Sequence, residues 1–203
     1  MTAKNRAQPS KLFDAYHTPT QLVRAGFDML CGLHGEWLET VESFVEPGCG
    51  PGSFCWGANL YCRNLKGKPV GVDIFPVKER RTDFKLVEKN FKSWNPKERF
   101  DLIASNFPFT WATEFLRKSA TLLSDTGMGL ALLRIGVLSG IERYTMWQED
   151  VNLKEVWVCV RRPGFQGKDG GTDASEYAFF LFDGKPPESR KAEPIIRWLW
   201  WDK

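Results

Sequence analysis

The sequence predicts an α/β protein whose seven-stranded sheet is mostly parallel, carries helices on both faces and has an antiparallel hairpin at one edge. Two observations lead to this fold class. Apolar strand-like runs alternate with amphipathic helical segments through most of the 203 residues, and that alternation is typical of a parallel sheet. The last two strand-like runs are joined by a glycine-rich segment without a helix, so we expect them to pair antiparallel.

The expected elements follow from hydrophobic periodicity. Strands are expected over 41–47, 68–75, 83–90, 99–105, 127–135, 153–162 and 175–184. Helices are expected over 18–33, after the glycines of 48–52, over 111–124 and over 140–150. We divide the chain into a flexible N-terminal segment (1–15), one domain (16–184) and a C-terminal tail (185–203) that packs on the domain.

Composition limits the class of protein. A hydrophobic content of 42% supports a sizeable core, and a net charge of +3 neither demands nor excludes a nucleic acid. No apolar run reaches the length of a membrane helix, and the polar N-terminus lacks a signal core. The five cysteines fit no zinc or disulfide pattern. We therefore expect a cytoplasmic monomer or weak dimer without a bound metal.

A glycine cluster follows the first predicted strand and opens a helix. Gly48, Gly50 and Gly52 in "FVEPGCGPGSF" allow a tight turn and close approach of a ligand to the backbone. A dinucleotide fingerprint fails because Ser53 stands where glycine or alanine is required, and the triphosphate pattern fails for lack of its lysine. Asp73 ends the next strand, where a carboxylate can accept both hydroxyls of a ribose. A plain turn and a capping aspartate are the alternatives; together the two features favour a nucleoside site.

A second unusual strand end is "SNFPF", which follows the apolar run "FDLIA". It places Asn106, Phe107, Pro108 and Phe109 directly after a buried strand. Ligands of parallel sheets bind at the carboxyl ends of the strands. The glycine cluster, Asp73 and this segment all stand at such ends, so we expect them to meet at one edge.

These motifs resemble the S-adenosylmethionine-dependent amino-methyltransferases, whose best-known members methylate the N6 amino group of adenine in DNA. "YHTP" (16–19), "EPGCGPGSF" (46–54), "VDIF" (72–75) and "SNFPF" (105–109) carry the resemblance. The segment "RRPGF…GGTDASEYAFF" also resembles small methyltransferase-like proteins of phages and prophages. The resemblance implies a Rossmann-like methyltransferase fold and S-adenosylmethionine as the cofactor.

The resemblance also implies which residues bind the cofactor. Ile74 would flank the cofactor adenine, Asn90 would contact its amino group, and Phe91 would pack beside the ring. An ordinary strand-end turn at 89–91 is a nearly equal alternative. The full cofactor-binding set is Tyr16, His17, Thr18, Pro19, Glu46, Gly48, Gly50, Gly52, Asp73, Ile74, Asn90 and Phe91.

The predicted catalytic set is Asn106, Phe107, Pro108 and Phe109. The Asn106 side-chain oxygen and the Phe107 carbonyl would each accept one N–H of the attacking amine. Phe109 would stack on the flat face of the acceptor. The departure from the family is Phe107, where proline is usual; it loosens the backbone and adds a ring near the site. Alternatively, the two phenylalanines are core residues and Asn106 forms a turn.

The substrate side is predicted from one loop and one aromatic residue. The set is Trp111, Arg161, Arg162, Phe165 and Lys168, which would line the acceptor pocket or contact phosphates. We expect adenine in DNA as the acceptor, with RNA, a protein glutamine or a small molecule as alternatives. A non-catalytic cofactor-binding protein is a further alternative. A nicotinamide-dependent oxidoreductase is disfavoured by Ser53.

Overall fold

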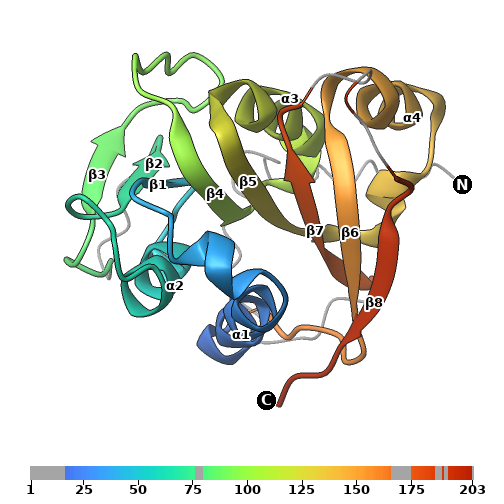
Figure 1. The fold of residues 1–203 in the computed structure, drawn as a ribbon, viewed down its shortest axis with the longest axis horizontal. Coiled ribbons are helices and arrows are strands. Elements are labelled where there is room, and N and C mark those ends of the chain that lie inside the picture. Colours follow the sequence, from blue (N-terminus) through green and yellow to red (C-terminus); the bar gives the residue numbers. More distant parts are fainter. Residues whose placement is uncertain (1–16, 76–79, 166–174, 186–188, 190–191, 203) are drawn as a thin grey trace, which may run out of the picture.

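A computed structural model describes residues 17–75, 80–165, 175–185, 189 and 192–202. Its centre is an eight-stranded sheet with the order β3-β2-β1-β4-β5-β7-β6-β8 (Figure 1). The strands are β1 Phe44–Pro47, β2 Val70–Asp73, β3 Lys85–Glu88, β4 Phe100–Asn106, β5 Leu123–Arg134, β6 Asn152–Cys159, β7 Tyr177–Asp183 and β8 Ile195–Leu199.

The sheet is mostly parallel, as predicted. Strands β3, β2, β1, β4 and β5 pair parallel with one another. Strand β7 lies antiparallel between β5 and β6, so the predicted antiparallel hairpin is present. The fold differs from the prediction in its eighth strand: β8, from the tail that was expected only to pack on the domain, pairs parallel with β6. Arg197 on β8 donates to the buried Glu155 on β6, which anchors the added strand.

Helices cover both faces of the sheet (Figure 1). Helices α1 (Thr20–Leu38) and α2 (Ser53–Tyr61) pack on one face. On the other face lie α3 (Ala112–Leu122), α4 (Ile141–Thr145) and the π-helical turn η3 (Met146–Asp150). Two short 3-10 turns are η1 (Phe109–Trp111) and η2 (Ile135–Leu138). Within the described residues, no helix has the length and apolar character needed to cross a membrane.

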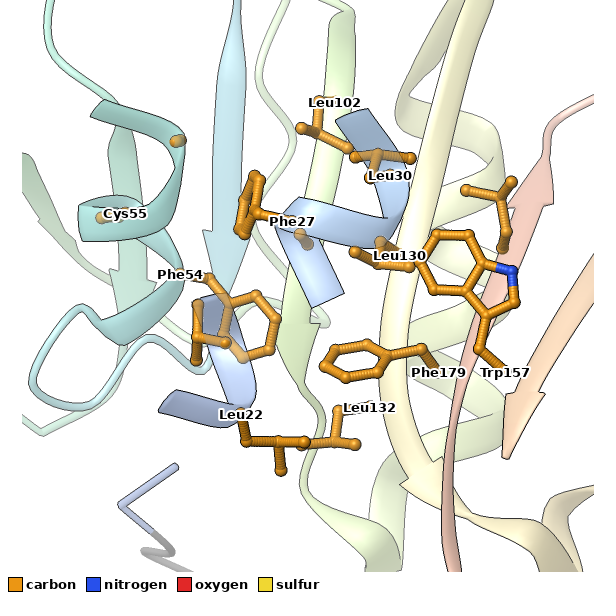
Figure 2. Close-up of a cluster of buried hydrophobic side chains, with 14 of the residues drawn as sticks. Leu22, Phe27, Leu30, Phe54, Cys55, Leu102, Leu130, Leu132, Trp157 and Phe179 are labelled. Carbon is orange, nitrogen blue, oxygen red and sulfur yellow. The ribbon is translucent and has the colours of Figure 1, made fainter. Parts of the chain in front are cut away.

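The core on the α1 and α2 face is built from large aromatic and aliphatic side chains (Figure 2). Phe54 from α2 lies between Phe27 of α1 and Phe179 of β7, with ring centroids 6.5 and 6.3 Å away. Burying each such side chain contributes about 1.5–3 kcal/mol. This layer fixes the N-terminal ends of α1 and α2 beside the carboxyl ends of β1 and β4.

The core on the opposite face holds one residue of the predicted catalytic set. The Phe107 side chain is 1% exposed, and its ring centroid lies 5.6 Å from that of Phe115 on α3. Phe91, which follows β3, also packs against Phe115, with 5.0 Å between the ring centroids. The segments that follow β3 and β4 are therefore held together by shared packing on α3.

We predict that Gly52→Ala lowers the free energy of unfolding by roughly 2–4 kcal/mol. Gly52 has φ +85°, and a Cβ there would lie 2.3 Å from the ring of Phe84, so the substitution combines backbone strain with a clash. Urea denaturation measures the change. The matched control is Gly32→Ala inside α1, where a Cβ meets nothing within 4 Å and helix propensity should rise. Equal stability of the two variants would contradict the prediction.

Candidate active site at the carboxyl edge of the sheet

The glycine loop between β1 and α2 is held in a conformation that favours glycine. Gly48, Gly50 and Gly52 have φ values of +64°, +46° and +85°. The N–H groups of Gly48 and Cys49 both donate to the carbonyl of Val72, at 2.7 and 3.2 Å, which ties the loop to β2. A Cβ at Gly50 would meet no atom within 4 Å. The loop therefore presents bare backbone to open space, as the predicted cofactor contact requires.

Asp73, the last residue of β2, fixes the tip of this loop. Its Oδ2 accepts the N–H of Gly50 at 2.8 Å, and its Oδ1 accepts the N–H of Phe75 at 2.9 Å. Each carboxylate oxygen can accept a second hydrogen bond, so both retain capacity for ribose hydroxyls. The following side chains, Ile74 and Phe75, are 50% and 47% exposed and offer an apolar surface beside the loop.

Glu46 supports the same loop from inside the protein. Its side chain is buried, and its two carboxylate oxygens accept the N–H groups of Phe54 and Cys55 at 3.2 and 2.8 Å. These N–H groups belong to the first turn of α2, where the helix dipole favours negative charge. Burial nevertheless raises the pKa of Glu46 to about 8, with the two backbone hydrogen bonds opposing the rise. Glu46 shapes the loop from beneath.

The segment before α1 reaches both the glycine loop and the catalytic motif. The hydroxyl of Ser53, at the start of α2, donates to the carbonyl of Thr18 at 3.4 Å. The side-chain amide of Asn106 donates to the Thr18 hydroxyl oxygen at 3.2 Å. His17 and Pro19 flank this contact in sequence, and Tyr16 lies outside the described residues. Three motifs that are distant in sequence thus meet around Thr18.

Asn106 presents a buried acceptor that has no partner. Its Nδ2 is engaged by Thr18, while its Oδ1 is inaccessible to solvent and makes no hydrogen bond in the described part of the chain. Leaving such an oxygen unpaired costs about 1–3 kcal/mol. An unpaired oxygen at the end of a central strand is a candidate acceptor for a ligand N–H.

The residues around Asn106 are fixed by contacts with β1. The Ser105 hydroxyl donates to the Pro47 carbonyl at 2.6 Å, which joins the ends of β4 and β1. The ring of Pro108 lies against Gly48, 3.4 Å from the position that a Cβ would occupy there. The Phe107 ring packs in the core against Phe115, which agrees with the alternative that Phe107 is a core residue.

An aromatic and cationic cluster stands next to Phe109. The centroid of the Phe109 ring lies 5.6 Å from that of Tyr177, and the guanidinium carbon of Arg134 lies 4.4 Å from the Phe109 centroid. Phe165 meets Tyr177 edge-on at 4.9 Å, so this predicted substrate residue is brought toward the motif. Arg134 and Tyr177 were missed in the sequence. Arg134 ends β5, so the strand-end rule used for Asp73 could have found it, whereas Tyr177 begins the antiparallel strand β7 and that rule does not reach it.

The other predicted cofactor residues lie in the turn after β3. The Asn90 Oδ1 accepts the backbone N–H of Lys92 at 3.0 Å, as in an ordinary polar turn. Phe91 is buried against Phe115 and Trp94. The roles proposed for Asn90 and Phe91 at the cofactor adenine remain predictions.

The remaining predicted substrate residues make other contacts. Trp111 is 43% exposed and lies under the ammonium of Lys92. Arg162 forms an ion pair with Glu176, with 2.8 Å between Nη2 and Oε1. Arg161 stacks over Trp200. The predicted Lys168 lies outside the described residues. The structure therefore brings Phe165 to the motif but engages Trp111, Arg161 and Arg162 in contacts within the chain.

Four of the five cysteines are buried. Burial raises the pKa of Cys62 and of Cys159 to about 12, and it also raises the pKa values of Cys49 and Cys55. These thiols are therefore protonated at neutral pH. Among the described residues, no three histidine, cysteine or acidic side chains gather in a way that could hold a metal ion.

Comparison with known proteins establishes the fold. No protein-family model matches the chain. It is similar over 99 residues to the trans-aconitate 2-methyltransferase of Escherichia fergusonii, with 32% identity; the alignment covers 45% of this chain and 38% of that relative. The chain thus spans well under half the length of this curated relative.

Solved structures resemble the chain over most of its length. A candidate RNA methyltransferase from Pyrococcus horikoshii has a TM-score of 0.64 and 16% identity and covers 87% of this chain and 90% of its own. A candidate class I S-adenosylmethionine-dependent methyltransferase from Listeria monocytogenes has a TM-score of 0.64 and 10% identity. The match covers 90% of this chain and 65% of the Listeria chain. A type I restriction-modification methyltransferase subunit from Streptococcus thermophilus has a TM-score of 0.61 and 14% identity. The match covers 83% of this chain and 44% of the Streptococcus chain. The chain has the Rossmann-like methyltransferase fold.

We predict that the stability of the wild-type protein falls as pH rises from 4.5 toward 8. The pKa of Glu46 is raised from 4.5 to about 8 in the folded state. Between these values the folded protein keeps a proton that the unfolded chain has released, so the free energy of unfolding decreases with rising pH. Urea denaturation across this window measures the slope. Glu46→Gln should flatten it, and parallel slopes for both proteins would refute the assignment.

Proposed function

We propose that the chain is an S-adenosylmethionine-dependent methyltransferase that acts on an exocyclic amino nitrogen, with adenine in DNA as the acceptor. The observation that carries the proposal is the buried Oδ1 of Asn106, which has no partner in the described part of the chain. An oxygen in that state is suited to accept an N–H of an amine. Support for adenine comes from the resemblance of "SNFPF" to the adenine-methylating motif and from the aromatic ring of Phe109 beside it.

The residues at the sheet edge fit the cofactor. The bare backbone at Gly50 leaves room for its methionine part, and the Asp73 carboxylate stands where ribose hydroxyls would bind. The exposed Ile74 side chain offers an apolar surface for its adenine. When bound, S-adenosylmethionine supplies a methyl group whose bond to a positively charged sulfur breaks as the acceptor nitrogen forms the new bond.

The chain's own residues act on the acceptor. The Asn106 oxygen accepts one N–H, which directs the nitrogen lone pair away from it and stabilises the positive charge that develops on nitrogen. The Thr18 hydroxyl oxygen accepts the Nδ2–H of Asn106, which leaves Oδ1 as the acceptor for the amine. The carbonyl of Phe107 accepts the second N–H in this proposal. The proton leaves to water after transfer, so no strong base is required.

A carboxylate is the second candidate acceptor. One observation favours it: the curated relative from Escherichia fergusonii is named for trans-aconitate, a carboxylate. A carboxylate, however, has no N–H to give, and its oxygens would face the Asn106 oxygen. Because two acceptors repel when brought together in a buried site, the geometry of Asn106 favours the amine.

We expect wild-type protein to bind S-adenosylmethionine, and Asp73→Ala to weaken binding by at least about tenfold, because charge-assisted hydrogen bonds to the ribose are lost. Isothermal titration calorimetry measures both affinities. Asp125→Ala is the matched control: Asp125 is an exposed carboxylate near the start of β5, at the opposite end of that strand from Arg134. Absence of binding by wild-type protein would overturn the proposed function.

We expect Asn106→Ala to lower kcat for methyl transfer by about 10²–10³ while cofactor affinity changes little. The measurement follows labelled methyl groups into single-stranded oligodeoxynucleotides with and without adenine, and into trans-aconitate. Thr18→Val, which removes only the group that holds the Asn106 amide, should lower kcat less. Labelling of trans-aconitate alone would replace the amine with the carboxylate, and full activity of Asn106→Ala would remove Asn106 from the chemistry.

A further inference from the structure

Contacts with Phe109 and Tyr177 hold the Arg134 guanidinium beside the motif. The guanidinium carbon lies 4.4 Å from the centroid of the Phe109 ring, a cation–π distance. The Nε of the same group donates to the Tyr177 hydroxyl oxygen at 3.3 Å. The Tyr177 ring itself lies 5.6 Å from Phe109. Phe109 is thus contacted by a cation and by a second ring that are joined to each other.

Strand register brings these residues to the acceptor side of Asn106. Asn106 pairs with Leu132 on the neighbouring β5. Arg134 lies two residues further along β5, beyond the end of β4, and it pairs with Tyr177 at the start of β7. The cluster therefore stands where β4 has ended and Phe109 begins η1. This is the opposite side of β4 from β1 and its glycine loop, because β4 lies between β1 and β5.

We propose that Arg134, together with Tyr177, is a positioning residue that fixes the Phe109 ring as one wall of the acceptor pocket. This inference rests on the proposed function, because it assigns a role toward the acceptor of that reaction. The guanidinium acts through the ring, because its cation–π contact and its hydrogen bond to Tyr177 keep Phe109 in one position. Phe165 packs edge-on against the Tyr177 ring, with 4.9 Å between the ring centroids.

The chemistry of the contact explains why arginine is needed. A guanidinium is planar, so it stacks on a ring while its Nε–H donates in its own plane. A lysine keeps the charge but has no planar fork, so it can keep the cation–π contact but not the bond to Tyr177 in the same geometry. Glutamine at this position loses the cation. The series arginine, lysine, glutamine should therefore loosen Phe109 stepwise.

The kinetic test uses single-stranded oligodeoxynucleotides that contain adenine. Arg134→Gln should raise the acceptor KM by roughly two- to thirtyfold, with Arg134→Lys in between. The calorimetric affinity for S-adenosylmethionine should change less than about twofold, a split that a general loss of folding would not produce. Tyr177→Phe, which keeps the ring but removes the acceptor hydroxyl, should raise KM in the same direction. Arg117→Gln, which removes the ion pairs of this α3 residue with Glu142 and Asp150, is the matched control.

A second measurement needs no acceptor. In the ligand-free protein, the Nε–H resonance of Arg134 should be shifted by the ring current of Phe109, and it is assigned by its loss in Arg134→Lys. Phe109→Leu should move this resonance toward the value of an exposed arginine, and Tyr177→Phe should speed its exchange with water. If the Arg134 Nε–H resonance did not move in Phe109→Leu, the contact between Arg134 and Phe109 in solution would be overturned.

The outcomes separate this inference from the function on which it rests. Wild-type activity on adenine with an unchanged KM for Arg134→Gln would overturn the positioning role alone. Preferential labelling of trans-aconitate that depends on Arg134 would also overturn it, because the guanidinium would then bind a carboxylate. Cofactor binding without transfer to any oligonucleotide would count against adenine as the acceptor, and the resonance of Arg134 would still decide whether it holds Phe109.

Discussion

The site depends on one constraint, the parallel register of β2, β1, β4 and β5. Parallel strands end at the same edge of a sheet, so Pro47, Asp73, Asn106 and Arg134 reach one line although 87 residues separate the first from the last. Two contacts tighten this line: the Ser105 hydroxyl bonds β4 to β1, and the Val72 carbonyl holds the glycine loop to β2. Without that register the motifs at the strand ends would not meet at one edge of the sheet.

Packing turns this edge into two distinct halves. On the β1 and β2 side, Glu46, Asp73 and the glycine loop form a polar cradle of backbone and carboxylate groups. On the β5 and β7 side, Arg134 and the buried rings of Phe165 and Tyr177 form a cluster that packs against the partly buried Phe109. Asn106 lies between them, on β4. In the proposed reaction, the polar half would bind the charged cofactor and Phe109 would face the planar acceptor.

Phe107 shows how one departure from a motif can be absorbed. Proline at this position would restrict the backbone directly. Here the Phe107 ring is buried against Phe115, which itself packs on Phe91, and a buried ring restricts the backbone by packing. The core therefore replaces a local covalent restraint with a tertiary one. Asn106 and Pro108, on either side of Phe107, keep their contacts with Thr18 and Gly48.

The sequence by itself determined the alternation of strands and helices, the glycine loop, the acid at the end of β2 and the place of Asn106, because each depends on local periodicity or on residues at strand ends. Only the tertiary structure decided that the tail forms β8, because that strand depends on an edge of β6 and on the buried Glu155. It also decided that Phe107 faces the core and that Arg134 and Tyr177 enclose Phe109. These choices depend on contacts between residues far apart in the chain, which no local pattern records.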